Sequence, residues 1–254
     1  MGIDITKDLK KYQHIFKEAH DQGMNESDTS LRISKFVENV LGYDVFSEVS
    51  REHAVKERNV DYAIHCNGKV HFFIEVKQAG TPLKEKHIEQ ANNYAANSGV
   101  HWVLLTNGKN WNMYHLSFDE GDGIQPDLAW SIDILEDDIK DSASKLSMLH
   151  RKNIIKGELD KYFEKLKILS PKSILQAIFH ENTLRLIGLH LRKTYGTKID
   201  EQELVEHIKK MISLETWEEI GDVKIIRAKK ISKPKPKITL CPVLIDTEEN
   251  KVEN

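Results

Sequence analysis

Cysteine is scarce in this sequence, since its 254 residues include only Cys66 and Cys241. Two cysteines exclude a disulfide framework and a cysteine-rich zinc cluster, and such scarcity is typical of a reducing compartment. Long apolar runs are also lacking, so we expect neither a membrane-spanning helix nor a signal peptide. These absences predict a cytoplasmic protein that makes no membrane contact.

Charge of one sign is lacking too. The chain has 37 basic and 40 acidic residues and a formal net charge of −3. A protein this close to neutrality does not bind nucleic acid through its overall charge, so any DNA-binding surface has to be a local patch. Hydrophobic residues at 39% and charged residues at 30% are typical of a globular protein.

The chemistry is concentrated between Val60 and Tyr94. Two apolar-rich runs flank Asn67-Gly68, which is a strong β-hairpin signal. The first run opens with Asp61, and the second ends in Glu75-Val76-Lys77. An acid at the end of one strand and an acid-x-lysine at the end of the next are typical of a metal-dependent phosphodiesterase site.

The register of the hairpin decides whether the two acids share a face. A two-residue loop would pair Asp61 with Ile74 and put Glu75 on the opposite face. A three-residue loop ending at Gly68 shifts the register by one. Asp61 then pairs with Phe73, and Glu75 is its diagonal neighbour on the same face. That register also gathers seven apolar residues on the other face, so we predict it: Val60, Tyr62, Ile64, Val70, Phe72, Ile74 and Val76.

Two carboxylates can hold Mg²⁺ together with a backbone carbonyl and waters. The candidate ligands are Asp61, Glu75 and the carbonyl of Val76, and Glu48 on the preceding segment is a further candidate. Mn²⁺ is able to substitute for Mg²⁺ at such a site. Lys77 lies two residues after Glu75 and therefore points into the same site, where it would orient or deprotonate the attacking water or stabilise the developing charge.

A helix predicted over residues 83–97 carries Gln90 and Tyr94 one turn apart, where they could contact substrate or hold the lysine. The alternative for the whole pattern is a solvated strand face, because an acid followed by Glu-x-Lys also occurs by chance. The strand setting, the register and the helix together favour a site.

Hydrophobic spacing predicts the rest of the fold. It indicates helices over 4–20 and 28–41, strands over 45–49, 100–105 and 111–116, and a charged connection over 51–58. The order predicts an α/β sandwich around a mixed sheet. Trp111 and Tyr114 could stack on bases, but core packing is the favoured interpretation.

The remainder of the chain predicts a helical extension and a tail. We divide the sequence into a nuclease-like domain over 1–132, helices over 133–213 that include 173–195 and 199–211, and a basic then acidic tail over 214–254. The basic run could grip phosphates, and a solubilising tail explains it equally well. Its candidate DNA contacts are Lys224, Arg227, Lys229 and Lys230.

The hairpin, the helix after it and the following strands resemble a known family, the N-terminal nuclease domain of type I restriction enzyme R subunits, within the PD-(D/E)xK superfamily. The resemblance covers about residues 31–116 and rests on five features: Val60-Asp61-Tyr62, Ile74-Glu75-Val76-Lys77, Gln90-x-x-x-Tyr94, Leu105-Thr106-Asn107-Gly108, and Trp111 with Tyr114. It implies a restriction-endonuclease-like three-layer sandwich with a central mixed sheet and magnesium-dependent DNA cleavage. Asp61, Glu75 and Lys77 would be catalytic, with Gln90 and Tyr94 as the accessory motif.

Two departures qualify the resemblance. Val60 stands where many nucleases of the superfamily have proline, and a residue other than proline is common there in this branch. The sequence has no Gly-x-x-x-x-Gly-Lys-Ser/Thr loop, so we expect no use of ATP, and a motor or methyltransferase would have to come from a partner.

The sequence therefore favours a Mg²⁺-dependent DNA endonuclease of the restriction type, acting against foreign DNA. The alternative is a nuclease-like subunit that binds DNA or recruits a partner without cutting. A third possibility is an assembly role, in which the helical extension forms a homodimer.

Overall fold

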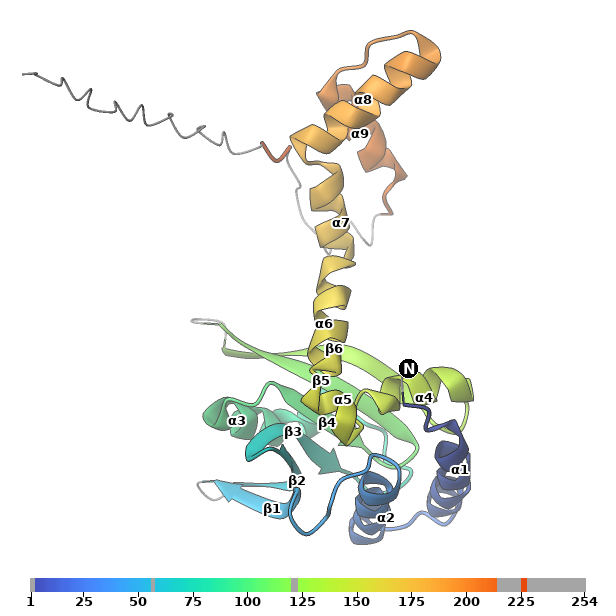
Figure 1. Ribbon diagram of the computed structural model, residues 1–254, viewed down its shortest axis with the longest axis vertical. Helices are drawn as coiled ribbons and strands as arrows, with labels where there is room; N and C mark the ends of the chain where they lie inside the picture. The colour runs from blue at the N-terminus through green and yellow to red at the C-terminus, as the bar shows by residue number, and fades with distance from the viewer. Residues whose placement is uncertain (1–2, 56–57, 120–122, 214–224, 228–254) are drawn as a thin grey trace, which may run out of the picture. The chain divides into compact units, whose positions relative to one another are not determined.

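The computed structural model describes residues 3–55, 58–119, 123–213 and 225–227 of the chain, without the side chains of residues 52–55, 58–59, 90, 94 and 119 (Figure 1). The chain divides into two compact units, Met1–Ser170 and Pro171–Asn254. The first unit holds a six-stranded mixed sheet with flanking helices, and helices dominate the described part of the second. The predicted mixed α/β protein with C-terminal helices is confirmed at this level.

The first unit begins with two helices and ends with three. Between them lie the six strands, the short 3₁₀ helix η1 and one further helix. The bounds are α1 Thr6–Asp21, α2 Glu26–Asn39, β1 Val49–Val55, β2 Arg58–Cys66, β3 Lys69–Val76, η1 Glu85–His87, α3 Glu89–Ser98, β4 Trp102–Thr106, β5 Asn110–Asp119, β6 Gly123–Asp133, α4 Ile139–Ser147, α5 Arg151–Ile155 and α6 Glu158–Ile168.

The strands lie in the sheet in their sequence order, β1 to β6. β3 and β4 are parallel, and the other neighbouring pairs are antiparallel. A parallel pair needs a crossover connection, and η1 with α3 supplies it. The strand predicted over 45–49 is wrong, since β1 begins at Val49 and runs through most of the predicted connection. The charges of that segment suit an edge strand, which β1 is.

Apolar side chains fill both faces of the sheet. Residues of α1, α2 and α4–α6 join one face in the larger cluster, in which Phe16, Phe36 and Trp111 are almost fully buried. Residues of α3 join the other face, with Ala63, Phe73 and Tyr114 beneath them. The prediction that Trp111 and Tyr114 pack in the core is confirmed.

The hairpin between β2 and β3 differs from the predicted one. Cys66 pairs with Lys69 across a two-residue Asn67-Gly68 turn, in which both residues have positive φ, 52° and 75°. That turn is of type I′, the form whose twist matches antiparallel strands and which Asn-Gly favours. The predicted three-residue loop is therefore wrong.

With a two-residue loop alone, the residues at the end of β3 would face the opposite side of the sheet from the predicted one. A bulge in β3 turns them back. His65 pairs with Val70 but Ile64 pairs with Phe72, so His71 has no partner across the hairpin. One extra residue moves every later side chain of β3 to the other face. Val70, before the bulge, therefore packs on the α3 cluster, whereas Phe72, Ile74 and Val76, after it, lie in the larger cluster with Tyr62 and Ile64. Val60, on β2, also lies in the α3 cluster.

Helices α4–α6 pack on the same core as the sheet. Leu146, Leu149 and Phe163 from this segment lie in the cluster that also holds α1 and α2. The first unit therefore continues to Ser170, beyond the division at residue 132 that the sequence predicts. The helical pattern is visible in the sequence, but the surface on which it packs is not.

The second unit contains α7 Pro171–Ile178, α8 Glu181–Tyr195 and α9 Glu201–Met211. The single helix predicted over 173–195 is two helices, because the chain turns at Phe179 and the side chain of His180 caps α8. Phe179, Leu184, Leu204 and Val205 form the buried cluster of this unit. No helix in the described parts of the chain is long and apolar enough to cross a bilayer.

Substitution of Gly108, in the turn between β4 and β5, is expected to be strongly destabilising. Its φ is 87°, and a Cβ there would lie 2.9 Å from Cδ1 of Phe16. Backbone strain and overpacking together should lower the free energy of unfolding of Gly108→Ala by about 2–5 kcal/mol. Gly68→Ala is the matched control, since its φ is 75° and a Cβ there meets nothing within 4 Å. Equal losses in denaturant unfolding would contradict the packing argument.

Candidate active site

Asp61 and Glu75 lie next to each other across the hairpin. Tyr62 pairs with Ile74, so the next pair outward places Asp61 opposite Glu75, with both side chains on one face. The backbone N–H of Val76 donates to Oδ2 of Asp61 at 2.7 Å. The two acids thus share a face as the sequence analysis required, although a different turn and a bulge bring them there.

Glu75 is a buried acid, with 8% of its side chain exposed. Burial and the negative charge of Asp61 raise the pKa of Glu75 from 4.5 to about 7, against the opposing effect of Lys77. A carboxyl group with this pKa is poised to gain or lose a proton near neutrality, as catalytic groups are.

This pKa predicts that Glu75 weakens the fold as pH rises. The folded state holds the Glu75 proton more tightly than the unfolded state, so the contribution of Glu75 to stability is complete below about pH 4.5 and is lost as pH rises through about 7. In metal-free protein, Glu75→Gln should therefore gain stability relative to wild type between pH 5 and 8, by an amount on the order of 1–3 kcal/mol. Urea unfolding of both proteins across this range measures the difference, and a gap that does not change with pH would contradict it.

Lys77 donates a hydrogen bond from Nζ to Oε1 of Glu75 at 2.6 Å. Burial disfavours the ammonium, but the hydrogen bond to Glu75 and the negative charges of Glu75, Glu26 and Asp61 outweigh it and raise the pKa of Lys77. Lys77 is therefore protonated near neutral pH. Of its candidate roles, orienting the water and stabilising negative charge fit this state, and deprotonating the water does not.

Glu26 is a site neighbour that the sequence analysis missed. It lies in the first turn of α2, with Oε2 3.9 Å from Nζ of Lys77. The backbone N–H of Ala79 bonds to the carbonyl of Met24 at 3.1 Å and to Oγ1 of Thr29 at 3.2 Å, which ties the end of β3 to the start of α2. In the sequence, Glu26 is only a favourable charge at a helix start, so no local signal could have found it.

The carbonyl of Val76 also points toward the acids. In a strand, the N–H and C=O of one residue lie on the same side, and the N–H of Val76 is bonded to Asp61. The next N–H, of Lys77, points the other way, to the carbonyl of Thr106 at 2.8 Å. The Val76 carbonyl therefore lies on the Asp61 side of β3, which makes it a candidate third oxygen donor beside Asp61 and Glu75.

This donor set fits a divalent cation. Carboxylate and carbonyl oxygens are what Mg²⁺ and Mn²⁺ accept, and a cation would relieve the repulsion that contributes to the raised pKa of Glu75. Within the described ranges, no three His, Cys, Asp or Glu side chains group around a possible metal position. A cation would thus depend on two carboxylates, one carbonyl and water.

Helix α3 carries the accessory residues. It packs over the face of the sheet that holds Ala63 and Phe73, the face of Asp61 and Glu75. Gln90 and Tyr94 lie on α3, but their side chains are outside the described part of the structure, so their roles stay predictions. Burial and the positive charges of Lys77, Lys86 and Lys84 lower the pKa of His87, which lies in η1.

Glu48 does not join this group. Its carboxylate accepts from Nε of Arg151 at 2.6 and 2.7 Å, and its carbonyl accepts from the N–H of His65 at 2.7 Å. His65 lies at the turn end of β2, about 13 Å along the strand from Asp61 at the usual rise per residue. The structure therefore places Glu48 away from the proposed metal ligands.

The basic tail is only partly described. Lys224, Lys229 and Lys230 lie outside the described residues. Arg227 is described, and its Nη1 lies 3.3 Å from Oε2 of Glu201 and 3.8 Å from Oε1 of Glu181. Two carboxylates of the second unit thus engage this guanidinium, which leaves the predicted phosphate contact without structural support.

A comparison with solved structures gives a distant similarity to the subject of "Characterization and crystal structure of the type IIG restriction endonuclease BpuSI". Identity is 17% and the TM-score 0.35, over 62% of this chain and 21% of that one, so the chain spans about a fifth of the length of that protein. No curated protein matches the chain.

A comparison with family models gives a match over residues 36–125 to the family described as Type I restriction enzyme R protein N terminus (HSDR_N). The matched segment contains the hairpin, α3 and the turn between β4 and β5. It therefore includes Asp61, Glu75, Lys77 and the helix that carries Gln90 and Tyr94. Residues 36–125 of this chain therefore match the N-terminal HSDR_N domain of type I restriction enzyme R subunits.

Proposed function

We propose that this protein is a Mg²⁺-dependent DNA endonuclease of the restriction type, with a restriction-endonuclease-like three-layer fold, acting in defence against foreign DNA. The observation that carries the proposal is the contact of Lys77 with Glu75 at 2.6 Å, beside Asp61 on the same face. A half-buried lysine beside two neighbouring acids, of which Glu75 is buried, is costly to assemble for stability alone. The family of the matched segment supplies the DNA and restriction context.

Asp61, Glu75 and the Val76 carbonyl would hold the cation. When bound, Mg²⁺ (or Mn²⁺ in its place) supplies charge neutralisation at the scissile phosphate and a lowered pKa for a coordinated water. Glu75 has to be ionised to act as a ligand, so its pKa of about 7 makes metal affinity rise with pH through neutrality.

Lys77 would supply a fixed positive charge beside the reacting phosphate. Its protonated ammonium is fixed by Glu75 and lies near the acids that hold the cation. A fixed positive charge there stabilises the negative charge that develops on the phosphate oxygens and orients the attacking water. Glu26, at 3.9 Å, helps to keep that ammonium charged.

DNA is the proposed substrate, and ATP has no proposed role. As the matched family belongs to restriction complexes, a motor or methyltransferase subunit is a proposed partner. The second unit, with its exposed Leu186, Leu189 and Tyr195, is the proposed location of a homodimer contact. Size-exclusion chromatography with light scattering tests that last point.

The direct test is incubation of the purified chain with plasmid, linear and single-stranded DNA in Mg²⁺, Mn²⁺ or EDTA. We expect cleavage with either metal and none with EDTA. DNA binding without cleavage of any substrate would instead support the non-cleaving, partner-recruiting subunit.

A further inference from the structure

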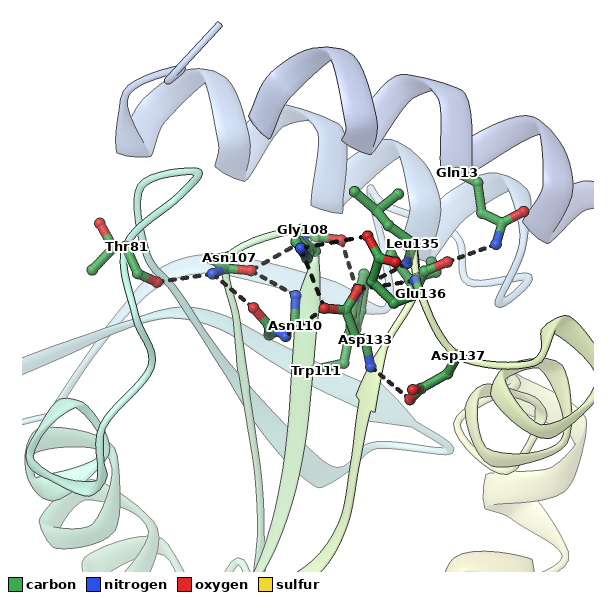
Figure 2. A network of polar contacts seen from close by, with 12 residues as sticks. Gln13, Thr81, Asn107, Gly108, Asn110, Trp111, Asp133, Leu135, Glu136 and Asp137 are labelled. Carbon is green, nitrogen blue, oxygen red and sulfur yellow. Dashed lines mark hydrogen bonds and ion pairs between the residues drawn. The ribbon is translucent and has the colours of Figure 1, made fainter. Parts of the chain in front are cut away.

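The turn between β4 and β5 belongs to a motif that the proposed chemistry does not use. Asn107 is 3% exposed, and its Oδ1 accepts from the N–H groups of Lys109 at 3.0 Å and Asn110 at 2.7 Å (Figure 2). Oγ1 of Thr106 accepts from the N–H of Gly108 at 3.0 Å and donates to the carbonyl of Asn110 at 2.9 Å. The turn is therefore closed by its own side chains.

The other end of the Asn107 side chain reaches out of the turn. Its Nδ2 donates to the carbonyl of Thr81 at 2.8 Å (Figure 2). The preceding residue, Thr106, accepts the N–H of Lys77 at 2.8 Å. Two consecutive residues of the turn thus bind both ends of the segment that leads from Lys77 to Thr81.

The turn is also anchored by hydrogen bonds that do not involve the Asn107 amide. Nδ2 of Asn110 donates to Oδ2 of Asp133 at 3.3 Å, and Nε1 of Trp111 donates to the carbonyl of Gly108 at 2.9 Å (Figure 2). Trp111 in turn packs on Phe16 of α1, with ring centroids 5.7 Å apart. The bond from Asn107 to Thr81 therefore ties the segment after β3 to an anchored turn.

We infer that the side-chain amide of Asn107 is a positioning group for Lys77. The ammonium of Lys77 has to keep its place beside Glu75, and the path of the chain from Lys77 to Thr81 sets how far the end of β3 can move. Misplacement of a reacting group by 1 Å can lower a rate about 10²-fold. The inference rests on the proposed nuclease function, and it adds a residue that contacts neither metal nor DNA.

The chain offers variants that separate this role from turn formation. Asn107→Asp keeps the oxygen that closes the turn, but it puts a carboxylate oxygen where Nδ2 now donates to Thr81. Asn107→Ser is a second variant, with an acceptor for the turn and no group long enough to reach Thr81. Asn110→Ala is the matched control, because it removes the bond to Asp133 and the longer 3.5 Å contact from Nδ2 of Asn107, and leaves the bond to Thr81.

Two measurements on the full chain test the inference. In hydrogen exchange, the amides of Lys77, Ala79 and Thr81 should exchange about three- to tenfold faster in both Asn107 variants, the factor that one neutral hydrogen bond is worth, and at the wild-type rate in Asn110→Ala. In DNA cleavage, both variants should lower kcat about 10- to 10²-fold, with KM for DNA and the Mn²⁺ dissociation constant unchanged.

The outcomes are decisive in each case. Unchanged exchange in the Asn107 variants, a kcat within twofold of wild type, or an equal loss in Asn110→Ala would overturn the inference. If the wild-type protein cuts no DNA with any metal, the proposed function fails, and the exchange comparison still decides whether Asn107 fixes the segment that follows Lys77.

Discussion

Asp61→Asn is expected to abolish metal-dependent DNA cleavage. Asparagine keeps an oxygen that can accept the N–H of Val76, so the hairpin should fold as before. It removes the negative charge, and with it one of the two proposed carboxylate ligands. Asp61→Ala should have the same effect on cleavage. DNA binding should survive in both, because neither substitution removes a positive charge and the site loses negative charge.

Glu48→Gln is the matched control for this prediction. Glu48 is also a mostly buried carboxylate next to β2, but it bonds to Arg151 rather than to the site. Its substitution should lower stability and leave the cleavage rate per folded molecule unchanged. Cleavage retained by Asp61→Asn, or abolished by Glu48→Gln alone, would place the metal site at the other end of β2.

Lys77→Ala is expected to reduce the cleavage rate while metal binding persists. The lysine contacts Glu75, but it supplies no oxygen ligand, so the Mn²⁺ dissociation constant should stay close to that of wild type. The rate should fall about 10²–10⁴-fold, the usual worth of a positioned group that works on the water or the developing charge. Single-turnover cleavage measured beside Mn²⁺ titration separates the two effects.

Lys109→Ala controls for the loss of a half-buried lysine. Its side chain is 22% exposed against 20% for Lys77, and it too lies near two carboxylates, those of Asp133 and Glu136. Cleavage should be unaffected by this change. A wild-type rate in Lys77→Ala, or equal losses in the two variants, would remove Lys77 from the mechanism.

The hairpin illustrates what the sequence can predict. Alternation of apolar residues located both strands and required Asp61 and Glu75 to share a face, which the structure agrees with. The loop length was wrong because the Asn67-Gly68 preference for a type I′ turn prevails locally. A bulge at His71 then returns Glu75 to the face of Asp61, and no residue type in the sequence predicts that bulge.

Contacts between elements that are far apart in the chain are not predicted by the sequence. Glu26 reaches Lys77 only because α2 packs beside the end of β3. Glu48 is bound by Arg151, which lies 103 residues away in the sequence, so the sequence does not reveal this ion pair. The amphipathic pattern of α4–α6 predicts helices, but it does not predict that Leu146 and Phe163 pack in the core of the sheet.

The most direct measurement is anomalous diffraction from crystals of the full chain soaked in Mn²⁺, with metal-free crystals as the reference. The account predicts a peak within coordination distance of Asp61, Glu75 and the Val76 carbonyl, and no such peak in Asp61→Asn crystals. A peak at Glu48, or none near Asp61 at pH 8 where Glu75 is ionised, would contradict the proposed metal site.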